Sequence, residues 1–184
     1  MVPVWDASSV TSGLIAAGVV LTAIAVWTDI RWGKVLNAVT VPFAALGLVL
    51  NTVGGGWDGL LLSIGGVGMG FVLWLASRLA GRILGGGDIK LLMALGALLG
   101  PVFVLWTFVV GALLGGILAI TLALRRGRLQ SALRQMAAGV YARAAVAAPM
   151  EIGEGSGELR LPYAVALSAG AWLVMGYGLW GSQW

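Results

Sequence analysis

Two aspartates are the side chains of this sequence best placed to do chemistry. Asp88 follows three consecutive glycines at the head of a long apolar run, and Asp29 stands where the first apolar run gives way to polar residues. Charge at a membrane boundary is costly unless it is paired or used. Two carboxylates that face each other across a hydrated pocket share one proton, because both cannot ionise cheaply. Such a pair can activate water against a peptide carbonyl, so the arrangement predicts aspartyl proteolysis.

The composition excludes several other chemistries. The chain has 184 residues, of which 60% are hydrophobic and 10% are charged, and it contains no Cys and no His. A soluble domain is about 25% charged, so this chain is predicted to be a polytopic membrane protein. Without Cys or His it has no disulfide, no Ser-His or Cys-His catalysis and no His-bound metal, and we expect neither a metal nor another cofactor. The net charge of +4 is interpreted as membrane topology and lipid contact, and not as nucleic-acid binding.

The apolar runs predict an all-α fold in which each run is a membrane-spanning helix. Asn37 is predicted to be the N-cap of the second helix. Turns are expected at residues 54–58 and at Gly100-Pro101, where glycines and a proline interrupt the apolar pattern. We expect a single transmembrane domain over residues 1–184, with six spans that cover residues 10–27, 38–53, 59–79, 88–99, 102–124 and 161–180.

The basic residues fall on one side of this predicted membrane. Lys and Arg follow the first, third and fifth spans, while the other two turns and both ends of the chain carry none. By the positive-inside rule that side is cytoplasmic, and both termini are extracytoplasmic. The cytoplasmic loop 125–160 includes a predicted basic amphipathic helix over 125–143 that lies on the membrane surface. The same topology puts Asp29 and Asp88 at the cytoplasmic boundary and Asp58 on the outer side.

The fourth predicted span is unusually short. If Gly100-Pro101 is the outer turn, the stretch from Asp88 to Leu99 covers only about 18 Å of a hydrocarbon core that is about 30 Å thick. Asp88 would then lie below the cytoplasmic surface, and the three glycines would form an irregular entry loop. Irregular backbone at that depth must be buried in protein or line water. We therefore expect a hydrated pocket open to the cytoplasm, with a glycine rim that lets a substrate backbone approach.

Structural interpretations remain open for several of these residues. Asp29 can be a helix-end charge that pairs with Arg31 or Lys34. Asp88 can be an N-terminal residue that the helix dipole favours. Lys90 fits a boundary lysine better than a catalytic one. Two functional alternatives also remain, a proton-coupled transporter that uses the two aspartates and a non-enzymatic assembly subunit. Helix packing is the interpretation of the spaced glycine pairs Gly66/Gly70 and Gly111/Gly115.

Three stretches of the sequence resemble one protein family. The stretch Gly85-Gly86-Gly87-Asp88 resembles the GxGD motif of intramembrane aspartyl proteases. The following Ile89-Lys90-Leu91-Leu92 makes it similar to the form found in bacterial type IV prepilin peptidases. Thr28-Asp29-Ile30-Arg31, followed by Asn37 and Thr40, resembles the first catalytic segment of that family. Leu161-Pro162-Tyr163-Ala164-Val165-Ala166-Leu167, with Gly170, resembles its closing helix.

The resemblance implies a function and a site. Asp29 and Asp88 would be the catalytic pair, while motif support or substrate binding would fall to Gly85, Gly86, Gly87, Lys90 and Asn37. The substrate would be a prepilin or pseudopilin, a transmembrane helix with a basic leader, cleaved at the cytoplasmic face of the bacterial inner membrane. An aspartyl protease for another substrate, such as a preflagellin, is the runner-up. Membrane lipids are the other expected partner, and the oligomeric state is left open.

Two positions depart from the pattern of this family. Leu36 stands where Pro is usual and Ala164 stands where Gly is usual, which bears on substrate preference more than on activity. Larger members of the family carry an N-terminal region with paired CxxC motifs and methylate the new N-terminus. This chain has no Cys and looks like the short form, similar to the peptidases of tight-adherence (Flp-type) pilus systems. We therefore do not expect it to methylate its product.

Overall fold

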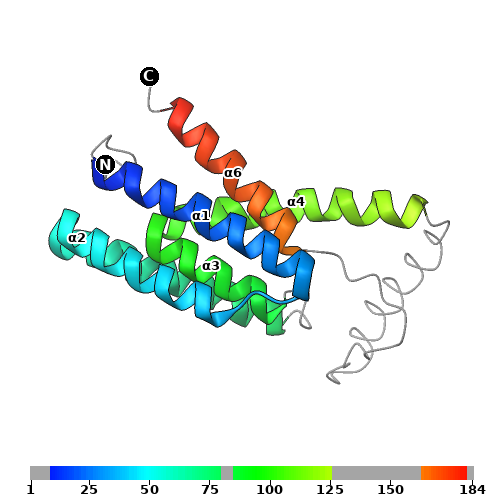
Figure 1. Ribbon diagram of the computed structural model, residues 1–184, viewed down its shortest axis with the longest axis horizontal. Coiled ribbons are helices and arrows are strands. Elements are labelled where there is room, and N and C mark those ends of the chain that lie inside the picture. The colour runs from blue at the N-terminus through cyan, green and yellow to red at the C-terminus, as the bar shows by residue number, and fades with distance from the viewer. Residues whose placement is uncertain (1–8, 80–84, 126–162, 182–184) are drawn as a thin grey trace.

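The computed structural model describes residues 9–79, 85–125 and 163–181, and the elements in these ranges are helices (Figure 1). This confirms the predicted all-α class for the part of the chain that the structure describes. The predicted loop 125–160, with its amphipathic helix over 125–143, lies outside the described residues beyond Arg125. The helices are α1 (Ser9–Trp32), α2 (Asn37–Leu79), α3 (Gly86–Leu99), α4 (Pro101–Arg125) and α6 (Tyr163–Gly181).

The long helix α2 is a hairpin of two arms. Its backbone is non-helical at Gly56, where φ is 59° and ψ is −131°. This left-handed conformation favours glycine, because a residue with a Cβ is strained there. The arms pack together, since Asn51 Nδ2 in the first arm donates a 3.0 Å hydrogen bond to Ser63 Oγ in the second. The turn predicted over residues 54–58 is therefore present, although the residues on either side of Gly56 remain helical.

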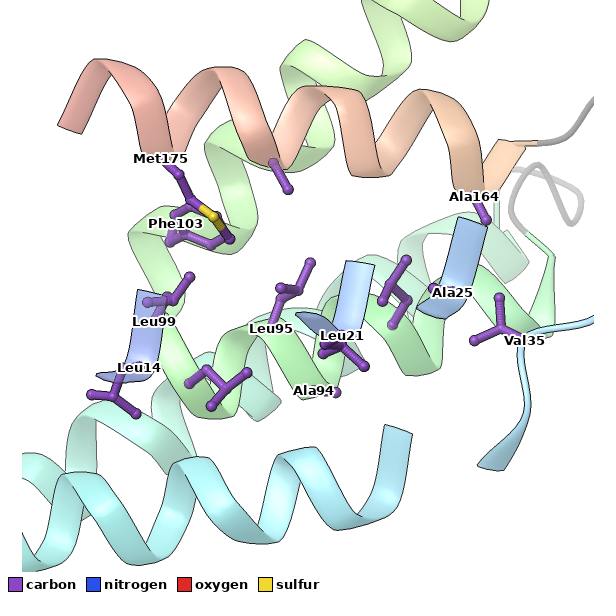
Figure 2. Close-up of a cluster of buried hydrophobic side chains, with 13 residues drawn as sticks. Leu14, Leu21, Ala25, Val35, Ala94, Leu95, Leu99, Phe103, Ala164 and Met175 are labelled. Carbon is purple, nitrogen blue, oxygen red and sulfur yellow. The ribbon is translucent and has the colours of Figure 1, made fainter. Parts of the chain in front are cut away.

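Helix α3 lies in the middle of the bundle and contacts α1, α2, α4 and α6 (Figure 1). It has 14 residues, which is about 21 Å of helix. From Leu91 to Leu99 the helix is apolar on every side, and all of these residues except the partly buried Met93 are buried. Figure 2 shows α3 side chains packed among those of its neighbours. From Leu91 onward the fully buried leucines are Leu91, Leu92, Leu95 and Leu98.

Glycines allow these helices to approach closely, as their spacing predicts. A methyl group added to Gly66 of α2 would overlap the backbone carbonyl of Gly96 in α3. One added to Gly170 of α6 would lie 2.7 Å from the backbone nitrogen of Gly111 in α4. Helices in contact through small residues gain van der Waals packing that larger side chains would prevent. The packing interpretation is thereby confirmed for Gly66 and Gly111.

Three described helices are long and apolar enough to cross a membrane, which indicates a membrane protein. They cover Ser12–Trp32, Asn37–Leu79 and Pro101–Thr121. The apolar stretch Ala164–Tyr177 of α6 is shorter. The six spans and the position of the termini stay predictions.

Candidate active site

Asp29 lies in the last turn of α1, because the helix continues past Trp27 to Trp32. The helix thus extends beyond the apolar run, and the membrane span over residues 10–27 stays a prediction. Gly33 ends the helix with a φ of 62°, and its N–H donates a 2.8 Å hydrogen bond to the carbonyl of Asp29. A glycine in the left-handed region just past a helix is a common C-cap. Asp29 is thus held on a regular helix with its backbone carbonyl already bonded, and its side chain is half-buried.

Asp88 is the third residue of α3 and caps its own helix. Gly85 is the N-cap residue, with φ −68° and ψ 148°, and it has no side chain to cap with. The Asp88 carboxylate instead accepts a hydrogen bond from the backbone N–H of Gly85. This is half of a capping box, in which an acidic or amide side chain reaches back to the N-cap N–H. The expected irregular glycine loop is therefore wrong for Gly86 and Gly87, which are helical.

The three glycines before Asp88 have different surroundings. A methyl group on Gly85 would lie 2.9 Å from Asp88 Oδ2. One on Gly87 would lie 3.2 Å from Val35 Cβ and 3.3 Å from the Val35 backbone nitrogen. One on Gly86 would meet nothing within 4 Å. Gly85 therefore leaves room for a carboxylate, while Gly87 lets α3 start against the connection between α1 and α2.

The two aspartates meet at one end of the bundle. Asp29 lies close enough to Asp88 for the two carboxylates to interact electrostatically. The apolar core supports this placement, since Val35, Ala25 of α1 and Ala164 of α6 belong to one buried cluster and lie at the same end of it (Figure 2). Neighbouring carboxylates titrate as a pair and share a proton. The site therefore has the electrostatic arrangement that acid–base activation of water requires.

Asp29 has an asymmetric set of contacts. Its carboxylate accepts a hydrogen bond from the backbone N–H of Ala164, in the first turn of α6. Its Oδ2 atom is covered from solvent and has no hydrogen-bond partner among the described residues. Arg31 and Lys34 are both exposed, so the alternative in which one of them neutralises Asp29 gains no support. An uncompensated buried carboxylate oxygen is unusual and calls for a proton, a water molecule or a ligand.

Two of the other predicted site residues, Asn37 and Lys90, do not join the two aspartates. Asn37 is exposed and is the first residue of α2 rather than its N-cap, while the N–H groups of Val39 and Thr40 bond to the carbonyl of Leu36. Lys90 is exposed on α3, which agrees with a boundary lysine. Among the described residues no three acidic side chains come together as metal ligands.

Sequence reasoning missed three contributors to this site. Gly33 could have been found, because a glycine after a helical pattern is a C-cap signal. The contact of Val35 with Gly87 and the N–H that Ala164 directs at Asp29 join segments far apart in the sequence. Helical periodicity and capping signals report only on residues near one another in the sequence. Neither contact could therefore be predicted from them.

A protein-family model matches the part of the chain that contains both aspartates. Residues 15–120, more than half of the chain, match the family model described as the type IV leader peptidase family. The matched stretch includes Asp29 and Asp88 and ends in α4, before α6 begins. No curated protein sequence and no solved structure matches the chain. On the strength of the family match and its long apolar helices, this membrane protein belongs to the type IV leader peptidase family.

Proposed function

We propose that the chain is an aspartic-type endopeptidase in which Asp29 and Asp88 activate water. The observation that carries this proposal is the meeting of the two carboxylates at one end of a helical bundle, brought there by α1 and α3. The family match independently supports a leader peptidase. Neither carboxylate is balanced by a nearby basic side chain in the described part of the chain, as a merely structural ion pair would be.

The chemistry follows from one proton shared by two carboxyl groups. The ionised carboxylate takes a proton from water, and the resulting hydroxide forms a bond to the carbonyl carbon of the scissile peptide. The protonated carboxyl group polarises the carbonyl oxygen and gives it its proton. The tetrahedral intermediate then collapses: the C–N bond breaks, the leaving amine takes the proton that came from water, and a hydroxyl group of the intermediate returns a proton to the carboxylate that gave up its own. Each cycle consumes one water molecule and returns the pair to its singly protonated state.

The proposed substrates are type IV prepilins or pseudopilins of the Flp-like class, cleaved at the cytoplasmic face of the bacterial inner membrane. The leader peptidase family supports a substrate with a short leader. The apolar helices of this chain suit a substrate whose own apolar helix stays in the membrane. A basic leader would be attracted to the acidic pair, while the exposed Arg31, Lys34 and Lys90 would repel it.

Co-expression with a candidate prepilin tests the proposal. Asp29→Asn and Asp88→Asn should each lower leader removal at least about 100-fold, because general acid–base groups contribute about 100- to 10,000-fold. Asp58→Asn is the matched control, since Asp58 is exposed beside the Gly56 turn at the other end of the bundle. The gel shift between precursor and mature prepilin measures cleavage. Normal cleavage by either Asn variant at Asp29 or Asp88 would refute the paired mechanism.

A further inference from the structure

The first turn of α6 contributes a backbone donor to Asp29. The first N–H groups of any helix have no carbonyl partner within that helix. Ala164 is the second residue of α6 and is fully buried, so its N–H cannot bond to water. The Asp29 carboxylate accepts this N–H. Asp29 therefore does for α6 what an N-cap side chain does for its own helix, although it lies on α1.

Independent contacts fix the register that makes this bond possible. Trp172 Nε1 on α6 donates a 2.8 Å hydrogen bond to Thr22 Oγ1 on α1. Ser168 Oγ, nearer the start of α6, donates to the backbone carbonyl of Thr22. The two helices run antiparallel (Figure 2), so going from Thr22 toward Asp29 leads from Ser168 toward Ala164. The contacts of Trp172 and Ser168 with Thr22 therefore set the register in which the Ala164 N–H reaches Asp29.

We infer that the backbone N–H of Ala164, at the start of α6, is a third component of the active site and positions the carboxylate of Asp29. This inference rests on the proposed function of the aspartate pair. The N–H holds one carboxylate oxygen and leaves Oδ2, which has no partner among the described residues, for the shared proton or for water. α6 lies outside residues 15–120, so the family match does not include this component.

The backbone origin of this donor has a consequence for the sequence. Ala164 stands where the resemblance leads one to expect Gly, yet either residue supplies the same N–H. Proline does not, because its ring replaces the N–H. Proline is nevertheless tolerated in the first turn of a helix, where the N–H is unpaired within the helix. Substitution by proline at Ala164 can therefore remove the donor without removing α6.

The matched variants are Ala164→Pro, Ala164→Val and Val165→Pro. Valine adds bulk similar to that of proline at the same buried position but keeps the N–H, and Val165→Pro puts the proline one residue further along the same turn. We expect Ala164→Pro to lower kcat for a prepilin about 10- to 100-fold relative to Ala164→Val, with KM within about twofold, because a small misplacement of a reacting group has an effect of this size. Val165→Pro should stay within about threefold of the wild type. Equal kcat values for Ala164→Pro and Ala164→Val would overturn the inference.

A stability measurement tests the contact without relying on activity. With Asp29 present, Ala164→Pro should lower the midpoint of thermal unfolding about 2–4 °C more than Ala164→Val does, the shift expected for one cap in a chain of this size. In the Asp29→Ala background this difference should vanish, because the acceptor is gone. A difference that persists in that background would contradict the contact. If the coupling is present but the wild type cleaves no prepilin, the proposed function fails and the structural role of Ala164 stands.

Discussion

The two ends of α3 are built in opposite ways. At its C-terminal end the carbonyls of Ala97 and Leu98 accept hydrogen bonds from Asn51 Nδ2 at 3.0 and 3.1 Å. Ser63 Oγ donates a further bond of 2.8 Å to Ala97. At its N-terminal end Gly85 and Gly86 are exposed, Asp88 is half-buried, and Oδ2 of the neighbouring Asp29 has no partner among the described residues.

This difference indicates how a short helix can hold a reactive group. Helix α3 has buried apolar side chains over most of its length, and its far end is bonded to both arms of α2. That end fixes the position and rotation of the helix, so the end with Asp88 needs few bonds of its own. Functional ends of a protein commonly leave polar groups unsatisfied, while the remaining contacts supply the stability. Substitutions at the two ends should therefore separate stability from activity.

The largest of these effects is expected at the bonded end. Asn51→Leu removes the donor for Ala97 and Leu98 and should lower the free energy of unfolding by about 1–3 kcal/mol, because a buried carbonyl is left unsatisfied. Thr52→Val is the control, since Thr52 Oγ1 bonds only to the Leu48 carbonyl of its own helix among the bonds described. Unfolding in detergent measures the loss. A stable Asn51→Leu variant would show that this end does not anchor α3.

A smaller effect, on activity rather than stability, is expected at the open end. Gly85→Ala places a methyl group 2.9 Å from Asp88 Oδ2, which is too close, so the carboxylate must move. Since a side-chain tip can shift easily, we expect little loss of stability but a cleavage rate about tenfold lower, or about 1.4 kcal/mol in the barrier. Gly86→Ala is the control, because its methyl group meets nothing. Equal activity of the two variants would show that the position of Asp88 is not tightly set.

The smallest effect is expected where α3 touches the α1–α2 connection. Gly87→Ala brings a methyl group to 3.2 Å from Val35 Cβ, which a shift of a few tenths of an ångström relieves. We expect a cleavage rate about threefold lower, or about 0.6 kcal/mol in the barrier. Combining it with Val35→Ala should recover a small part of the loss, because Val35 Cγ2, at 3.4 Å from the added methyl group, is then absent while Cβ and the backbone nitrogen remain. Losses that simply add in the double variant would show that the two residues do not press on each other.

The sequence predicted the parts of this molecule that local patterns encode. The helix breaks at Gly56 and Gly100 and the close approach at Gly66 and Gly111 followed from glycine chemistry and helix spacing. Charge topology predicted Asp29 and Asp88 as one catalytic pair, and that role stays a prediction. The helical state of Gly86 and Gly87 could not be predicted in this way. Glycine by itself disfavours a helix, and only the Asp88 cap and the packing of α3 reverse that preference.

The contacts that complete the site lay beyond such reasoning. Ala164 reaches Asp29 only because Trp172 and Ser168 set the register of α6 on α1. Val35 meets Gly87 only because the α1–α2 connection passes the start of α3. Each depends on how whole helices pack, and no spacing within a single segment reports it.

A cysteine-pair measurement tests the central claim, the meeting of Asp29 and Asp88, most directly. The chain contains no Cys, so introduced thiols have no competitors. The variant Asp29→Cys/Asp88→Cys should be linked within one chain by a short bifunctional thiol reagent, as read by mass spectrometry of the digested protein. The variant Asp58→Cys/Asp88→Cys should not be cross-linked, because its positions lie at opposite ends of the bundle. Absence of the 29–88 cross-link under conditions that link exposed control pairs would contradict the account.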